Sequence, residues 1–302
     1  MVTALDKMTP QESSALSALF SSGVLRELAD KGRSARFTRL IGLTRLEELM
    51  PNQAASSLKE TYDFAFERIA RSNLRSAYVY KNLLTQKRFL GRHSLSTASV
   101  LSEFRIANAK ADFVILNGTS TAYEIKSERD SLARLQGQLA AYLCAFDNVY
   151  VVASEIHLDK LAELIPHEVG LVKVNTKLGL TTVREAIPNK TKTVPSVIFD
   201  SLTLQEATYA VKELGFAIPQ VPNTRIRKEL KALFERLEPS SAHDVAVVAL
   251  RKFRSLLPLR DFLSLIPRSL VAAGISSDLS AGSRNRLLAT LDVDLNTAHS
   301  WI

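Results

Sequence analysis

The chain has 302 residues, of which 46% are hydrophobic, and a formal net charge of +8. This composition excludes a disordered or fibrous chain and allows a substantial core in two or three domains. The excess positive charge favours an anionic partner, and a nucleic-acid backbone is the simplest one.

The sequence also limits where the protein works. No apolar run approaches the length that crosses a bilayer, so we expect no membrane insertion. The amino-terminal residues MVTALDKM lack the basic and apolar regions of a secretion signal, and the single cysteine, Cys144, excludes an internal disulfide. We therefore expect a cytoplasmic protein.

Residues 1–74 are predicted to form a helical amino-terminal arm. Apolar residues recur at helical spacing between Glu12 and Met50, and Gly32 interrupts the run. The arm is basic, so it could contain a helix pair that contacts DNA, or its cations could lie on solvated outer faces. The second interpretation is favoured because no distinct recognition helix can be identified.

Cations and aromatic residues alternate just before the first expected strand. The cluster comprises Arg68, Arg71, Arg75, Tyr78, Tyr80, Lys81, Lys87, Arg88, Phe89 and Arg92. Such a set can grip phosphates and stack on bases, with Lys81 and Arg92 as candidate nucleic-acid contacts. The sequence supports equally well that the aromatic residues are core and the cations keep the protein in solution.

A strand, a tight turn and a second strand follow. Residues 110–116 form an apolar run that ends at an Asn-Gly turn signal, and residues 122–127 supply the second strand. Alternation of side chains places Glu124 and Lys126 on one face of that strand. If Asp112 pairs opposite either residue, all three polar groups converge, whereas an odd register would bury Asp112 on the apolar face.

Two carboxylates and one ammonium group on an apolar hairpin need one another or an ion. Carboxylates this close repel each other, and hard oxygen ligands of this kind suit Mg²⁺ or Mn²⁺. The Ile125 carbonyl could complete a ligand set with Asp112 and Glu124. Lys126 would then stabilise an attacking water or the charge that develops on a phosphate, which is the chemistry of phosphodiester hydrolysis.

The next expected helix carries a polar stripe beside its apolar face. Arg134, Gln138 and Tyr142 follow at intervals of four, so they line one edge of the helix. This edge could face the same cleft as the acids. The run NVYVVAS at residues 148–154 predicts another buried strand.

In this order Asp112, the Glu-Ile-Lys run at residues 124–126 and the QxxxY spacing of Gln138 and Tyr142 resemble the elements of the PD-(D/E)XK nuclease superfamily, in its RecB-like and Cas4-like branch. The stretches AYVYKN, FLGRHSL, SEFRI, LNGTSTAYEIKSE and FDNVYVV resemble, more narrowly, the bacterial sce7726 family of that superfamily. The likeness is strongest over residues 75–190.

The resemblance implies an α/β fold with a restriction-endonuclease-like mixed sheet flanked by helical regions. It implies that Asp112 and Glu124 are metal ligands and that Lys126 is the catalytic lysine. Gln138 and Tyr142 would steady the site or contact nucleic acid, as could Arg134.

The sequence departs from the superfamily pattern at one position. Many members offer a further acid from the helix before the first strand, and residues 75–84 contain none. Glu103, in the expected first strand at residues 100–106, is the preferred substitute as a metal ligand. Glu128, two residues beyond Lys126, is the second candidate.

After the core, residues 158–165 read as a helix, and residues 169–174 with 180–186 read as a hairpin that extends the sheet. The stretch IPNKTKTVP at residues 187–195 is expected to be a linker. The remaining region, 191–302, is helical, and its outward cations suit a packed bundle that could also bind DNA or a partner protein.

We therefore expect three regions: an arm at 1–74, a nuclease-like core at 75–190 and a helical domain at 191–302. The expected activity is Mg²⁺- or Mn²⁺-dependent hydrolysis of DNA, in phage defence or mobile-element biology. The alternatives are a catalytically silent nucleic-acid-binding or regulatory protein on the same fold, and a scaffold that binds a partner or a second copy through its C-terminal helices. The sequence has no glycine-rich phosphate loop and no histidine or cysteine spacing typical of zinc.

Overall fold

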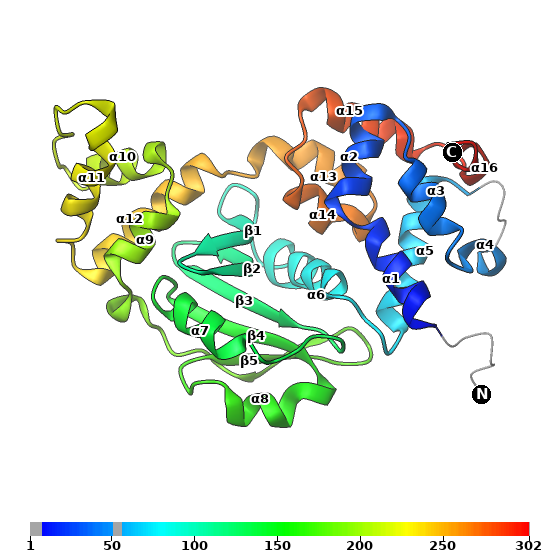
Figure 1. Ribbon diagram of the computed structural model, residues 1–302, viewed down its shortest axis with the longest axis horizontal. Coiled ribbons are helices and arrows are strands. Elements are labelled where there is room, and N and C mark those ends of the chain that lie inside the picture. The colour runs from blue at the N-terminus through cyan, green and yellow to red at the C-terminus, as the bar shows by residue number, and fades with distance from the viewer. Residues whose placement is uncertain (1–7, 51–55, 302) are drawn as a thin grey trace.

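The computed structural model describes residues 8–50 and 56–301, so most of the amino-terminal stretch considered above for a secretion signal lies outside it. The fold is α/β, with a central mixed sheet and helical regions at both ends of the chain (Figure 1). Within the described residues no helix is long and apolar enough to cross a bilayer.

The sheet has six strands whose spatial order follows the chain. The strands are β1 (Ser99–Ile106), β2 (Ala109–Leu116), β3 (Ser120–Lys126), β4 (Asn148–Ser154), β5 (Gly170–Val174) and β6 (Leu180–Arg184). The first three pair antiparallel, β3, β4 and β5 pair parallel, and β6 returns antiparallel. The expected strands, including the hairpin that extends the sheet, are confirmed.

The register of β2 on β3 decides where the polar residues of the hairpin lie. Phe113 pairs with Tyr123 and Val114 with Ala122, so the same register sets Asp112 across from Glu124. This is one of the two expected registers, with Asp112 opposite Glu124 or opposite Lys126, that bring the three polar residues to one face. Gly118, with φ of 100°, provides the left-handed turn residue between the strands.

Alternation along the strands divides the apolar side chains between two hydrophobic clusters. In β3, Ala122 joins the cluster under α7 (Leu135–Leu143), whereas Tyr123 and Ile125 join the cluster on the opposite face. Glu124 and Lys126 therefore belong to the α7 face. The helix α8 (Leu158–Leu164) also packs on this face, through Leu161.

A terminal lobe, formed by both ends of the chain, packs with the opposite face of the sheet (Figure 1). Its amino-terminal helices are α1 (Pro10–Leu19), α2 (Ser22–Lys31), α3 (Ala35–Ile41), α4 (Leu46–Leu49) and α5 (Leu58–Arg71). Its carboxy-terminal helices are α13 (Arg260–Leu265), α14 (Val271–Ser276), α15 (Ala281–Leu291) and α16 (Leu295–His299). Between the arm and the sheet, α6 (Ala77–Leu84) continues as a π-helix, η3 (Thr85–Leu90).

A second helical lobe packs with the α7 face of the sheet. It consists of α9 (Pro195–Ser201), α10 (Leu204–Glu213), α11 (Asn223–Phe234) and α12 (Pro239–Phe253). The helical region expected at 191–302 is thus shared between two hydrophobic clusters, one under α9 to α12 and one in the terminal lobe. Thr203 and Glu206 form a capping box at the start of α10.

Candidate active site

The site begins where β2 and β3 separate. Backbone pairing of these strands ends at Phe113 and Tyr123, and beyond it the Ile125 backbone N–H donates to Asp112 Oδ2 over 2.8 Å. The Asp112 carboxylate thus takes the place of a backbone acceptor. The two strands diverge at this point, and the Asp112 carboxylate lies against the backbone of β3 at Ile125.

Glu124 and Lys126 are buried beside it, with exposed fractions of 1% and 7%. Lys126 Nζ donates to Glu124 Oε1 over 2.8 Å and to Gln138 Oε1 over 3.1 Å. The Tyr142 hydroxyl lies 2.6 Å from Glu124 Oε2 and donates to it. Both QxxxY residues therefore contact the Glu-Ile-Lys run, because the helical period of α7 places them on one edge.

The two carboxylates perturb one another. Burial, and then the adjacent Glu124 carboxylate, raise the pKa of Asp112 to about 7, although the Ile125 N–H lowers it. Burial, followed by the charge of Glu124, raises the pKa of Tyr142, so its hydroxyl stays a donor. The site thus disfavours a second negative charge, which is the electrostatic condition that a bound cation relieves.

Glu103 lies at the rim of the site. Its carboxylate is 2.7 Å from Lys81 Nζ and 3.2 Å from Lys110 Nζ. Burial alone would raise the pKa of Glu103, but Lys81 and then Lys110 lower it below its ordinary value. The structure brings Glu103 and Lys81 to the site, with Glu103 held by two lysines.

A cleft of about 730 Å³ opens onto Asp112. Gln138 lines it, and three cationic side chains surround it: Arg105, Lys110 and Arg134. Arg134 immediately precedes α7 and is exposed. Cations around an acidic centre can bind the phosphates of a phosphodiester backbone next to that centre.

The sequence singled out neither Arg105 nor Lys110 as a site residue. They pair with each other across β1 and β2, so the cleft receives both. Lys110 lies two residues before Asp112, so the sequence could have indicated that it is a neighbour of this acid. The pairing with Arg105 depends on the register of β1, which no short pattern in the sequence specifies.

Other predicted contacts lie elsewhere. Arg92 lines a cavity on the opposite face of the sheet, together with Tyr123. Glu128 is 2.7 Å from Arg75 Nε in a buried ion pair and is not part of the carboxylate pair. The alternative in which the aromatic residues before the first strand stack on bases is wrong for Tyr80 and Phe89, because both are fully buried.

The donor set fits a hard divalent cation. Asp112 and Glu124 supply carboxylate oxygens, and Ile125 lies between Glu124 and Lys126 in the strand with a backbone carbonyl. Within residues 8–50 and 56–301 no group of three or more His, Cys, Asp or Glu side chains is placed to bind a metal. Mg²⁺, which keeps several waters and commonly uses one or two carboxylates, suits such a small set.

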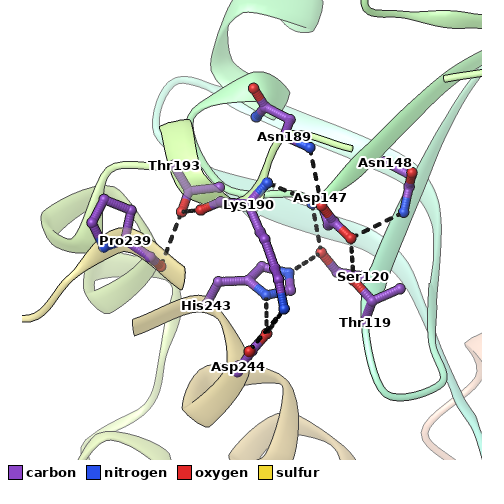
Figure 2. Close-up of polar contacts among 10 residues, drawn as sticks. All are labelled: Thr119, Ser120, Asp147, Asn148, Asn189, Lys190, Thr193, Pro239, His243 and Asp244. Atoms are coloured by element: carbon purple, nitrogen blue, oxygen red, sulfur yellow. Dashed lines mark hydrogen bonds and ion pairs between the residues drawn. The ribbon is translucent and has the colours of Figure 1, made fainter. Parts of the chain in front are cut away.

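A separate polar network joins the hairpin to α12 (Figure 2). Ser120 Oγ lies 2.8 Å from His243 Nε2, and His243 Nδ1 lies 2.9 Å from Asp244 Oδ1. This is the order of a Ser-His-Asp triad. However, Ser120 and His243 are each 1% exposed, and the adjoining cavity measures only about 20 Å³. That volume holds about one water, so the contact is structural.

Asp147 anchors the same network to the segment that precedes α9 (Figure 2). Its side chain accepts from the Thr119 hydroxyl over 2.6 Å and from the backbone N–H groups of Asn189 and Lys190 over 3.0 and 2.9 Å. Burial alone would raise the pKa of Asp147, but these hydrogen bonds outweigh it and lower the pKa. The expected linker at 187–195 does connect two regions, but it is bonded to the core.

The chain is similar in sequence to one family of known proteins. A sequence model of the family described as Bacteriophage P4 protein cII matches residues 70–259, which contain the sheet, the candidate site and α9 to α12. Protein cII of Enterobacteria phage P4 is 37% identical over 81 residues, which are 26% of this chain and 31% of that protein. The chain thus spans about a third of the length of this curated relative. No solved structure matches the chain.

Proposed function

This chain belongs to the family of bacteriophage P4 protein cII, and we propose that it is a divalent-metal-dependent nuclease that hydrolyses phosphodiester bonds in DNA. The observation that carries the proposal is the placement of Asp112 opposite Glu124, with Lys126 on the same face. A buried carboxylate beside a half-buried one, with one lysine between them and a cationic cleft, is poorly explained as a stabilising feature, because burying unbalanced charge is costly.

In the proposed reaction each residue has a separate task. The oxygens of Asp112, Glu124 and Ile125 would hold Mg²⁺ or Mn²⁺. When bound, the cation would lower the pKa of a water and offset charge on the phosphate. Lys126 then orients the water or stabilises the charge that develops during in-line attack on phosphorus.

Gln138 and Tyr142 act on the site residues. Gln138 accepts a hydrogen bond from Lys126 Nζ, which restricts the direction of the ammonium group. Tyr142 donates to Glu124 and fixes the rotamer of that carboxylate. Residues that orient ligands in this way commonly change metal affinity or activity by about 10- to 100-fold when they are removed.

The substrate would lie in the cleft along Arg105, Lys110 and Arg134. Three cations beside the reacting centre can each meet a backbone phosphate, and the net charge of +8 raises the local concentration of DNA. We place the activity in the bacterial cytoplasm, in the biology of phages and other mobile elements, because the family bears the name of a phage protein.

The test is incubation of the purified chain with supercoiled plasmid, linear duplex and single-stranded DNA, in Mg²⁺, Mn²⁺ or EDTA. We expect metal-dependent cleavage that falls about 100-fold or more in Lys126→Ala. Lys212→Ala is the matched control, because Lys212 is exposed on α10 and its side chain pairs with none of the described residues. Cleavage by Lys126→Ala at the wild-type rate would refute the assignment.

One observation favours a second candidate, a catalytically silent nucleic-acid-binding or regulatory protein. Lys126 ion-pairs with Glu124 at 2.8 Å and so neutralises the carboxylate that a metal would need. In that case the protein binds DNA with a steep dependence on salt concentration and shows no turnover in any metal. Lys126→Ala then leaves binding nearly unchanged.

A further inference from the structure

The sheet carries a second polar cavity on the face opposite Glu124. It measures about 310 Å³ and lies between the end of the π-helix η3 and the strands β2 to β5. Its walls include Arg88, Arg92, His93 and Tyr123. Nothing in the proposed hydrolysis uses these residues. π-Helical turns are rare and occur often at functional sites, and Arg88 lies within this one.

The charge of the cavity is predominantly positive. Arg88 donates to the Thr182 hydroxyl over 2.7 Å, which leaves most of its guanidinium donors free. The Arg92 side chain makes no hydrogen bond or ion pair among residues 8–50 and 56–301. The carboxylate in the wall, Glu185, already accepts from the Tyr150 hydroxyl over 2.6 Å. The cavity therefore offers two guanidinium groups with unused donors.

Tyr123 contributes a hydroxyl group to the cavity. Its side chain is only 6% exposed and lines the cavity, yet its hydroxyl makes no hydrogen bond within the described part of the chain. Burial raises the pKa of Tyr123 to about 12, so the group remains a donor at neutral pH. The hydroxyl is reached from the cavity, so it can donate to an acceptor on a ligand bound there.

The packing of the rings indicates which part of a ligand is recognised. Tyr123 stacks on Tyr150 with centroids 5.5 Å apart and also packs against Phe113. The other side of Tyr150 meets Gly170, where an added Cβ would lie 2.3 Å from the ring. Little ring face remains for a base, so the cavity offers hydrogen-bond donors and not a stacking surface.

We propose that this cavity binds a phosphate monoester, held by the Arg88 and Arg92 guanidinium groups and by the Tyr123 hydroxyl. Guanidinium forks match phosphate geometry, and a volume of 310 Å³ is at the small end of ligand sites, which suits a molecule of nucleotide size. The phosphate has two potential sources with the same chemistry, a free nucleoside monophosphate and the 5′-phosphate end of a DNA strand.

Calorimetric titration of the full chain in EDTA distinguishes these sources. The probes are inorganic phosphate, AMP, and two otherwise identical oligonucleotides that end in a 5′-phosphate or a 5′-hydroxyl. If the source is a DNA end, we expect the 5′-phosphorylated strand to bind at least about tenfold more tightly than its 5′-hydroxyl counterpart; if it is a free nucleotide, we expect AMP to bind below about 1 mM and the two strands to bind alike. Absence of binding by every phosphorylated probe at about 1 mM overturns the proposal.

Three variants test the residues. Arg92→Ala is expected to weaken binding about tenfold. Tyr123→Phe should weaken binding several-fold without lowering the melting temperature, because it removes a hydroxyl that bonds to none of the residues in the described ranges. Arg236→Ala is the matched control, at an exposed arginine beyond α11 whose side chain pairs with nothing in the part of the chain that the structure describes. Wild-type affinity in both cavity variants, or an equal loss in Arg236→Ala, overturns the proposal.

This result is separable from the proposed nuclease activity. Binding is measured without metal, and Lys126→Ala should bind the phosphorylated probe as wild type does, because Lys126 lies on the other face of the sheet. A chain that cleaves no DNA can therefore still bind the monoester. Equally, an active nuclease with no phosphate binding in EDTA would retain the first proposal and lose this one.

Discussion

Replacement of Asp112 by Asn should stabilise the protein in the absence of metal while it abolishes activity. Burial and the Glu124 carboxylate raise the pKa of Asp112 to about 7 from an unfolded value near 3.8. A raised carboxyl pKa means that the folded chain binds the proton more tightly than the unfolded chain. Stability therefore falls as pH rises through the interval from about 4 to about 7 and is level above it.

The size of the stabilisation follows from the shift in the pKa of Asp112. Removing the charge could raise the free energy of unfolding by at most about 4 kcal/mol. Local relaxation of the wild-type site reduces this limit, so we expect Asp112→Asn to be more stable by roughly 1 to 3 kcal/mol at pH 8. Each 1 kcal/mol is worth about 2 to 4 °C in the melting temperature of a protein this large. The Asn carbonyl can still accept from the Ile125 N–H, so the backbone contact is kept.

The assay is thermal unfolding in EDTA between pH 5 and pH 8. Asp112→Asn should melt above wild type at pH 8, and the difference should shrink as pH falls. Asp278→Asn, at an exposed carboxyl group, is the control and should show no such trend. Added Mg²⁺ at ten times its dissociation constant should stabilise wild type alone by about 1.4 kcal/mol and so raise its melting temperature. A variant less stable than wild type at pH 8 would refute the electrostatic reasoning.

Four further outcomes are expected. Tyr142→Phe should lower cleavage about 10- to 100-fold, because Glu124 loses the donor that orients it, and single-turnover rates in Mg²⁺ measure the loss. Asp147→Ala should destabilise the chain by roughly 2 to 4 kcal/mol in urea unfolding, because two backbone N–H groups and one hydroxyl lose their acceptor. Wild-type stability should also fall below about pH 4 as the lowered pKa of Asp147 is approached. Gly170→Ala should cost about 1 to 3 kcal/mol, because the new Cβ would overlap the Tyr150 ring; an unchanged urea midpoint would contradict it.

The local structure of the site was predictable from the sequence. An Asn-Gly turn fixes a short hairpin, and alternation in β3 fixes Glu124 and Lys126 on one face, so only the register of Asp112 remained open. The structure selects the partner Glu124. The i to i+4 spacing of Gln138 and Tyr142 likewise set both residues on one edge of α7.

The remainder depended on contacts between distant segments. Arg92 looks like its cationic neighbours in the sequence, but the path of the chain after η3 places it on the face away from Glu124. Lys81 and Glu103 are 22 residues apart, and their ion pair requires α6 to pack beside β1. The contact of His243 with Ser120 spans 123 residues. No periodicity within one element encodes such distances, because they arise from how elements pack.

Strands β1 and β2 are irregular next to Asp112 and Glu103. Ala111 and Val114 join the α7 cluster while Phe113 joins the other, so regular alternation is interrupted at Asp112. In the neighbouring strand Glu103 adopts φ of 55°, which is uncommon for any residue with a side chain. The same point in the sheet therefore carries an irregular backbone and a carboxylate whose charge the fold disfavours. Natural sequences depart from local consistency mainly at functional positions, so these departures support, independently of any motif, the proposal that this end of the hairpin is a functional site.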